Sequence, residues 1–446
     1  MSQAVLITNA RLVNEGRIDE GDLLAVDGRI AQVGGHISHP TAAVIDAAGR
    51  VLMPGMIDDQ VHFREPGATH KGDQATESRA AIAGGITSFM EMPNTKPQTV
   101  TLDALEAKFG LAAGRAWGNH AFYLGATNDN IDEIRRLGVD QTCGIKVFMG
   151  ASTGNMLVDD PKTLEQIFRD APTLVATHCE DTPTIKANEE HYRADYGDNI
   201  PMHLHPLIRS EEACWLSSSF AVDLARRFAT RLHVLHLTTA RELALFETGP
   251  VTDKRITVEA CVHHLYFSEA DYAQRGTLIK CNPAIKTAAD RAALRQALAD
   301  DRIDVIATDH APHTLEEKAD PSYFKAPAGL PLVQHALAMA LELVHDGVMP
   351  LTQLVRKVSH APAELFNVRE RGYLREGYWA DLVLVDMERS QTIVRDDVLY
   401  KCGWSPLEGD TLRSSIVATI VNGDLKYREG EFLGSAGGMR LEFERR

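Results

Sequence analysis

The chain has 446 residues, 44% of them hydrophobic and 24% charged, so it can bury a large core and has the composition of a soluble globular protein. Its 62 acidic residues outnumber its 46 Lys and Arg residues, and the net charge of −16 argues against nucleic-acid or anionic-membrane partners. The six cysteines form no Cys-x-x-Cys pair and no apolar run approaches the ~18 residues of a membrane span, so we expect reduced thiols and a cytoplasmic protein.

Short β-type runs separated by turns fill the first 55 residues and return near the C-terminus. Asp27-Gly28 between two apolar runs predicts a hairpin. The runs Asp381–Asp386 and Ser415–Asn422 have the same texture. We therefore expect one small β-sandwich-like domain built by residues 1–55 and 371–446. Two unrelated β appendages are the alternative.

Between these ends, apolar β-type runs alternate with helical patterns. The runs are Met56–His62, Ile86–Met92, Ala121–Gly125, Gly144–Met149, Thr173–His178, Leu232–Leu237, Ile256–Ala260 and Ile303–Thr308. Eight strands alternating with helices over roughly 250 residues is the count of a (β/α)8 barrel. The predicted fold class is therefore α/β, with a TIM-like barrel over residues 56–370. A doubly wound open sheet is the alternative.

Three of the intervening helices have recognisable ends. Asn130 is the predicted N-cap of a short helix that stops at Gly138. Asp160-Pro161 opens a second helix, because proline suits the first helical position. Ser210–Ala229 is a longer third helix.

Five metal-competent side chains lie in or at the ends of these strands: His62, Lys146, His178, His236 and Asp309. In a barrel, the carboxyl ends of all strands meet at one mouth. Each residue alone has an ordinary structural explanation, but their joint placement favours a shared metal site.

Lys146 is unusual because it lies inside an apolar strand, where an unpaired ammonium costs several kcal/mol. A neutral lysine can react with carbon dioxide to form a carbamate, whose oxygens can bridge two metals. The alternative is a lysine whose ammonium reaches the solvent at the barrel rim.

The stretch from Ile57 to Gly67 carries Asp58, Gln60, His62 and Arg64 at alternate positions. Residues two apart in an extended segment share a face. An imidazole that can bind a metal then lies beside a guanidinium that can hold a carboxylate, which is the nucleus of a plausible active site.

Taken together, the motifs of this chain resemble those of the amidohydrolase superfamily, and within it those of the class I dihydroorotases. The matching stretches occur in family order over almost the whole chain: His62-Phe63-Arg64-Glu65-Pro66-Gly67, Glu91-Met92-Pro93-Asn94-Thr95, Lys146-Val147-Phe148-Met149-Gly150, His178-Cys179-Glu180-Asp181, His233-Val234-Leu235-His236, Cys281-Asn282-Pro283, Ala307-Thr308-Asp309-His310-Ala311-Pro312-His313 and Lys401-Cys402-Gly403-Trp404-Ser405-Pro406.

The resemblance implies zinc-dependent, reversible hydrolysis of dihydroorotate to N-carbamoyl-L-aspartate in pyrimidine (UMP) biosynthesis. It implies that His178 and His236 hold one zinc, that His62 and Asp309 hold the other, and that carboxylated Lys146 bridges them. Asp309 would also move the proton. Substrate binding would fall to Arg64, Asn94, Asn282 and His313, although Asn94 and His313 are equally explained locally as loop residues. His310 and the pair His263-His264 are interpreted as structural.

One residue departs from the family pattern Asp-x-His-x-His-x-Arg, because Gln60 replaces the first histidine. An amide oxygen is a poor zinc ligand, so one or two zinc ions are expected, with the site beside Gln60 the weaker, absent, or completed by water or Asp58. Allantoinases and hydantoinases share the scaffold, but Arg64 suits a substrate that bears a carboxylate. A non-catalytic scaffold subunit is the third reading. A small-molecule partner is expected, and a homodimer or association with another pyrimidine enzyme stays open.

Overall fold

A barrel of parallel strands forms the centre of the computed structural model, which describes residues 4–150 and 154–444. Its strands are β6 (Met56–Val61), β7 (Ile86–Glu91), β8 (Asn119–Phe122) continued by β9 (Leu124–Gly125), β10 (Ile145–Phe148), β11 (Val175–His178), β12 (Leu232–Val234), β13 (Ile256–Cys261) and β14 (Val305–Ala307). Neighbours pair in parallel from β6 to β8 and from β9 to β14. A parallel bridge from Val61 to His310 sets β6 beside β14 and closes the ring. The predicted (β/α)8 barrel is confirmed.

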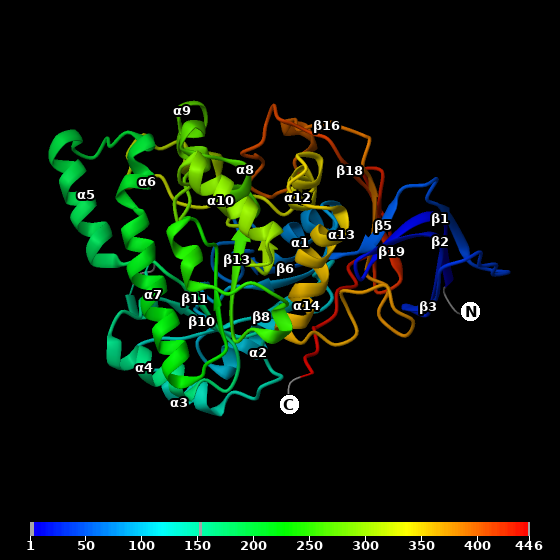
Figure 1. Ribbon diagram of the computed structural model, residues 1–446, viewed down its shortest axis with the longest axis horizontal. Coiled ribbons are helices and arrows are strands. Elements are labelled where there is room, and N and C mark those ends of the chain that lie inside the picture. The colour runs from blue at the N-terminus through cyan, green and yellow to red at the C-terminus, as the bar shows by residue number, and fades with distance from the viewer. Residues whose placement is uncertain (1–3, 151–153, 445–446) are drawn as a thin grey trace.

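Helices surround the barrel strands (Figure 1). The longer ones are α1 (Gln74–Ala83), α2 (Leu102–Ala112), α4 (Pro161–Asp170), α5 (Thr182–Tyr196), α7 (Glu211–Phe228), α10 (Ala288–Ala299) and α12 (Ala336–His345). The shorter ones are α3 (Ile131–Arg136), α6 (His205–Ile208), α8 (Val262–Tyr266), α9 (Tyr272–Arg275), α11 (Leu315–Lys318), α13 (Leu351–Val355) and α14 (Ala361–Phe366). Within the described residues, no helix combines the length and apolar character that crossing a bilayer requires.

Two of the three predicted helix starts have the expected caps. Asp160 accepts a hydrogen bond from the Thr163 amide at 2.8 Å, and Ser210 accepts one from the Ala213 amide at 3.3 Å. Asn130 precedes α3 but makes no capping hydrogen bond. Its side-chain oxygen instead accepts from the Thr127 amide at 2.7 Å, so a local turn takes the group that was predicted to cap the helix.

A nine-stranded sheet joins the two ends of the chain, and Figure 1 shows the N-terminal strands beside the C-terminal ones. The strands are β1 (Ala4–Asn14), β2 (Arg17–Val26), β3 (Arg29–Val33), β4 (Ala43–Asp46), β5 (Val51–Pro54), β15 (Leu382–Asp386), β18 (Ser415–Val421), β19 (Asp424–Arg428) and β20 (Glu431–Phe432). The short strands β16 (Gln391–Thr392) and β17 (Thr411–Leu412) pair separately. The junction is β5, which pairs in parallel with β1 and antiparallel with β15. Strands from both ends of the chain thus share one sheet, while the division at residues 55 and 371 stays a prediction. Residues 1–3 and 445–446 of the predicted β domain lie outside the described residues.

The sheet is fastened at the end of the barrel opposite the predicted site. Asn119, the first residue of β8, donates to the Asp381 carboxylate at 3.1 Å. Asp381 also forms a buried ion pair with Arg371 and accepts from the Asn422 amide at 2.8 Å. Because His62, His178, His236 and Asp309 lie at or beyond the carboxyl ends of their strands, the sheet leaves the barrel mouth free.

Candidate metal and substrate site

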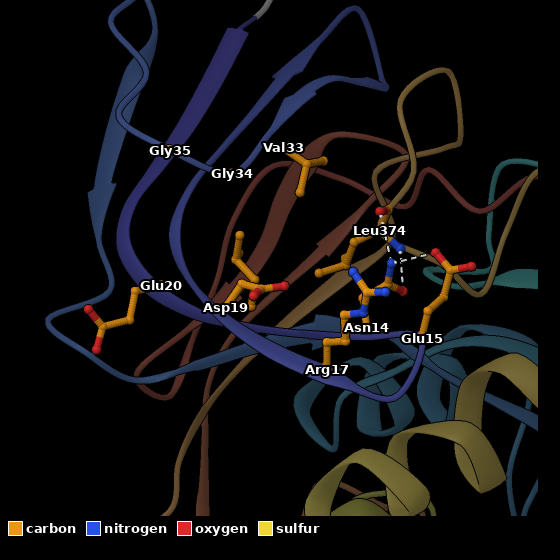
Figure 2. A pocket seen from close by; sticks show the side chains of 10 residues that line it. Asn14, Glu15, Arg17, Asp19, Glu20, Val33, Gly34, Gly35 and Leu374 are labelled. Carbon is orange, nitrogen blue, oxygen red and sulfur yellow. Dashed lines mark hydrogen bonds between the residues drawn. The ribbon is translucent and has the colours of Figure 1, made fainter.

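One pocket at the carboxyl ends of the barrel strands contains every predicted site residue. Its volume is about 230 Å³, and its lining is Gln60, His62, Arg64, Asn94, Lys146, Phe148, His178, His236, Asn282, Asp309, Ala311, His313, Ala328 and Gly329. A larger hollow of about 710 Å³ lies over β1 and β2, where Asn14 bonds with Glu15 and Leu374 (Figure 2). That hollow contains none of the predicted site residues, so the barrel pocket is the candidate site.

His178 and His236 point ring nitrogens at each other. Nδ1 of His178 lies 2.9 Å from Nε2 of His236. Burial lowers the pKa of both rings, so both are neutral near pH 7. Nε2 of His178 faces the Glu180 carboxylate at 2.7 Å, which fixes the ring as carboxylates fix metal-binding histidines. Two neutral imidazoles converging in this way suit a cation between them.

His236 occupies a strained backbone position just beyond β12. Its φ is +40°, in the left-handed region that non-glycine residues seldom adopt. This conformation ends β12 at Val234, three residues before the predicted end at Leu237. The amide of His236 donates to Oε1 of the buried Glu259 at 2.9 Å, which holds the turn in place.

His62 and Asp309 form the second pair of predicted ligands. Nε2 of His62 lies 3.1 Å from Oδ1 of Asp309. Burial acts to raise the pKa of Asp309, but the hydrogen bond and positive charge of His62 outweigh it, and the pKa is lowered from its usual value. The carboxylate is therefore ionised near neutral pH, as a metal ligand must be.

Gln60 points into the pocket, as the alternation along the strand predicts. Its amide nitrogen donates to Oδ1 of Asp309 at 3.0 Å. Its amide oxygen faces Sγ of Cys261 at 3.8 Å instead. Gln60 therefore presents a donor to the His62–Asp309 pair, and a nitrogen that carries two protons is not a metal ligand.

Asp58 does not line the pocket, although the alternation placed it on the same face. Its carboxylate accepts hydrogen bonds from the backbone amide and the hydroxyl of Thr308, at 3.1 and 2.6 Å. It also accepts one from the backbone amide of Gln60 at 3.3 Å. These contacts tie β6 to β14. The idea that Asp58 completes the first metal is therefore wrong, because its oxygens are committed to Thr308 and to the Gln60 backbone amide, and it does not line the pocket.

Lys146 is 1% exposed, and its Nζ has no hydrogen-bond partner among the described residues. The nitrogen lies 4.6 Å from the centre of the Phe148 ring. Burial lowers the pKa of Lys146 to about 8, so a substantial fraction is neutral in mildly alkaline solution. The alternative of a lysine reaching the rim is wrong, because the ammonium stays inside the barrel.

A cationic corner forms the other side of the pocket. Nη2 of Arg64 lies 3.0 Å from Nε2 of His313, and Nζ of Lys71 lies 3.0 Å from Nδ1 of the same ring. Nε of Arg64 donates to the Pro312 carbonyl at 3.0 Å, which fixes the guanidinium plane. Burial beside these two cations holds the pKa of His313 well below its usual value. Lys71 is paired with Glu317 at 2.9 Å, so the Arg64 guanidinium is the charge that favours an anionic group in this corner.

Two asparagines complete the lining. Oδ1 of Asn94 lies 2.8 Å from Nδ1 of His62, so Asn94 orients that ring as well as facing the pocket. Oδ1 of Asn282 is buried and has no hydrogen-bond partner among the described residues. Such an oxygen can receive a hydrogen bond from a ligand at little cost.

Comparison with known proteins agrees with this geometry. The sequence profile of the Amidohydrolase family matches residues 51–426. The chain belongs to the amidohydrolase family. A dihydroorotase of Halobacterium salinarum is 35% identical over 408 residues, which cover 89% of this chain and 90% of the relative. An allantoinase of Bacillus velezensis is 29% identical and covers 96% and 95%. The solved L-hydantoinase of Arthrobacter aurescens superposes with a TM-score of 0.92 at 28% identity, over 99% of this chain and 100% of the other.

Amidohydrolases are typically metal-dependent, and the pocket of this chain fits that chemistry. Two pairs of converging ligand atoms line the same pocket as a buried amine that has no hydrogen-bond partner among the described residues. Such an unpaired amine is unfavourable for a protein on its own, since buried polar groups are normally satisfied.

Several residues of the site escaped the sequence analysis. Glu180 lies within a matching motif without a predicted role, and the sequence predicts no role for Glu259 or Lys71. Their partners are His178, His236 and His313. Acidic and basic residues of this kind carry no local signal, because their function lies in which distant side chain they meet.

Proposed function

We propose that this amidohydrolase is a dihydroorotase. The observation that carries the proposal is the buried Arg64 guanidinium, which is held beside His313 in the same pocket as the two ligand pairs. Dihydroorotate combines a cyclic amide with a carboxylate, so it can occupy both sides of the pocket at once. The names of full-length relatives at 30–35% identity support the same substrate. The proposal places the enzyme in pyrimidine biosynthesis.

We further propose zinc as the metal, held by His178 and His236 and by His62 and Asp309, with carboxylated Lys146 between them. The neutral amine of Lys146 attacks carbon dioxide, a C–N bond forms, and one proton is released to give the carbamate. Bound zinc supplies Lewis acidity towards water and towards the amide carbonyl.

The residues of the chain perform the remaining steps. Arg64 and His313 hold the substrate carboxylate, and Asn282 faces the ring. Asp309 accepts a proton from the attacking water on its carboxylate and returns it to the ring nitrogen as the C–N bond breaks. Both observed hydrogen bonds to Asp309 fall on Oδ1, which leaves Oδ2 outside them.

A substrate comparison on zinc-loaded protein tests the proposal directly. Dihydroorotate, allantoin and hydantoin should be assayed side by side, and dihydroorotate should give the highest kcat/KM. The full-length similarity to an allantoinase and to an L-hydantoinase makes cyclic amides without a carboxylate the second candidate. A preference for either would replace the proposal, and inactivity on all three would favour a non-catalytic scaffold.

Arg64→Lys should lower kcat/KM for dihydroorotate by about 10-fold or more, which corresponds to about 1.4 kcal/mol. Lysine keeps the charge but loses the planar fork that contacts both Pro312 and His313. Arg115→Lys is the matched control. Arg115 pairs with Glu65, the residue that follows Arg64, and neither Arg115 nor Glu65 lines the pocket. Unchanged kinetics in Arg64→Lys would remove Arg64 from substrate binding.

Gln60→His should raise the zinc content by up to about one ion per chain and slow the loss of zinc to a chelator. Histidine would supply a lone pair where the amide nitrogen now faces Asp309, so the His62–Asp309 zinc should be the looser one in the unaltered protein. Gln60→Asn keeps an amide and should add no zinc at the His62–Asp309 pair. Equal zinc content in Gln60→His and the unaltered protein would contradict this ranking.

The proposal involves a small-molecule substrate and neither nucleic acid nor membrane, consistent with the net charge of −16. A homodimer or a complex with another pyrimidine enzyme is compatible with it. Sedimentation of the purified protein measures which state it adopts.

A further inference from the structure

A second group of potential metal ligands lies behind Gln60. Ligand atoms of Cys261, His263 and His264 lie within 4.8 Å of one another, and all three side chains are buried. Cys261 ends β13, and the two histidines belong to the first turn of α8. The thiol and the imidazoles are therefore brought together by a single strand-to-helix turn.

The histidines of this group are poorly satisfied by the protein. Neither ring nitrogen of His263 makes a hydrogen bond of normal geometry to a described residue, although the Thr308 backbone lies near. Nε2 of His264 faces the Pro283 carbonyl at 3.1 Å, and Nδ1 has no partner in the described part of the chain. When Nε2 donates to that carbonyl, the lone pair lies on Nδ1, as in histidines that bind metals through one nitrogen and are fixed through the other.

Gln60 offers a fourth potential ligand to this group. Its Oε1 lies 3.8 Å from Sγ of Cys261. Two ligands on a tetrahedral zinc with bonds of about 2.3 Å to sulfur and about 2.1 Å to oxygen are roughly 3.6 Å apart. The carboxylate of Glu259 lies 3.7 Å from the same sulfur and adds negative charge that favours a cation.

We propose that Cys261, His263 and His264 form a further binding site for a thiophilic divalent cation of the zinc class, with the amide oxygen of Gln60 at the fourth position. The thiol gives up its proton to solvent on binding, and the thiolate and imidazole lone pairs replace it with the metal. No redox step is involved. The site is separate from the His62–Asp309 and His178–His236 pairs, and it assigns a role to the amide oxygen that faces away from Asp309.

The other buried cluster, Asp59 with His233 and Glu259, does not make the same case. Nε2 of His233 lies 3.3 Å from both carboxylates, and Nδ1 lies 2.9 Å from the Thr257 hydroxyl. Both ring nitrogens are thus already satisfied inside the protein. The Cys261 group differs because three of its four histidine nitrogens have no hydrogen-bond partner among the described residues.

Cobalt(II) titration of chelator-treated full-length protein tests the proposal. None of the ligands proposed for the catalytic metals is a cysteine, so a near-ultraviolet thiolate-to-cobalt charge-transfer band reports this site alone. We expect the band to grow to saturation with about one equivalent of cobalt. Absence of the band in the unaltered protein, measured while cobalt binds elsewhere, would overturn the proposal without any variant.

Variants then assign the sulfur. Cys261→Ser should lose the band, and His264→Gln should weaken cobalt binding at this site by about 10-fold or more. Cys214→Ser is the matched control, because Cys214 is equally buried and contacts Thr238 instead. Lys146→Ala should keep the band, since it alters only the proposed catalytic site. A band that survives Cys261→Ser in a variant with unchanged circular dichroism would assign the metal to another cysteine and refute the site.

Discussion

Lys146→Ala should lower kcat/KM for dihydroorotate by about 10³-fold or more, while the protein remains folded. The proposed bridging ligand would support transition-state charge worth several kcal/mol, and each ~1.4 kcal/mol is one decade in rate. The ammonium of Lys146 has no partner among the described residues, so its removal breaks no hydrogen bond or ion pair. Alanine also removes a buried amine whose pKa is lowered to about 8, which spares the folded state a desolvation cost.

The carbamate itself can be observed separately from activity. Zinc-loaded protein incubated with ¹³C-bicarbonate should show a carbamate carbon signal that Lys146→Ala lacks. Lys254→Ala serves as the control, because Lys254 is also a buried amine but pairs with Asp304 outside the pocket lining. An active zinc enzyme without the labelled signal would refute the carbamate while leaving the metal site intact.

The sequence is sufficient to bring the proposed ligands together because each follows or lies within an apolar strand. His62, His178 and Asp309 come directly at or after the strands β6, β11 and β14. In a parallel barrel, position along a strand determines position in space, so strand ends meet at one mouth. That argument needs no knowledge of side-chain contacts, and every residue it selected lines the pocket.

Orientation within the site could not be predicted in the same way. The amide of Gln60 is oriented by Asp309 and Cys261, which lie 249 and 201 residues away in the chain. Asp58 shares the alternation of Gln60 but is turned aside by Thr308. Lys318, with its Nζ held by the carbonyls of Lys280, Pro327 and Gly329, fixes the loop that brings Ala328 and Gly329 over the pocket. Such contacts depend on tertiary packing, which leaves no periodic trace in the sequence.

Asp309→Asn should reduce kcat/KM by about 10²–10⁴-fold, the range that general acid–base groups contribute. Asparagine matches the carboxylate in size and can still accept from His62 or Gln60, but it cannot take a proton from water. The pKa of Asp309 is held below its usual 3.8. The wild-type carboxylate therefore stays ionised as the pH falls, until the pH drops below this lowered pKa. The acid limb that belongs to this group should therefore lie at low pH and disappear in the variant.

Asp304→Asn separates catalysis from the loss of a buried charge. Asp304 directly precedes the same strand, β14, and it is likewise buried, but it pairs with Lys254 at the end away from the pocket. Its replacement should lower the melting temperature, since breaking a buried pair leaves Lys254 uncompensated. The kcat/KM of the folded fraction should be unchanged. If Asp309→Asn retained kcat/KM within 10-fold of the unaltered enzyme, the proton would have to move through another group.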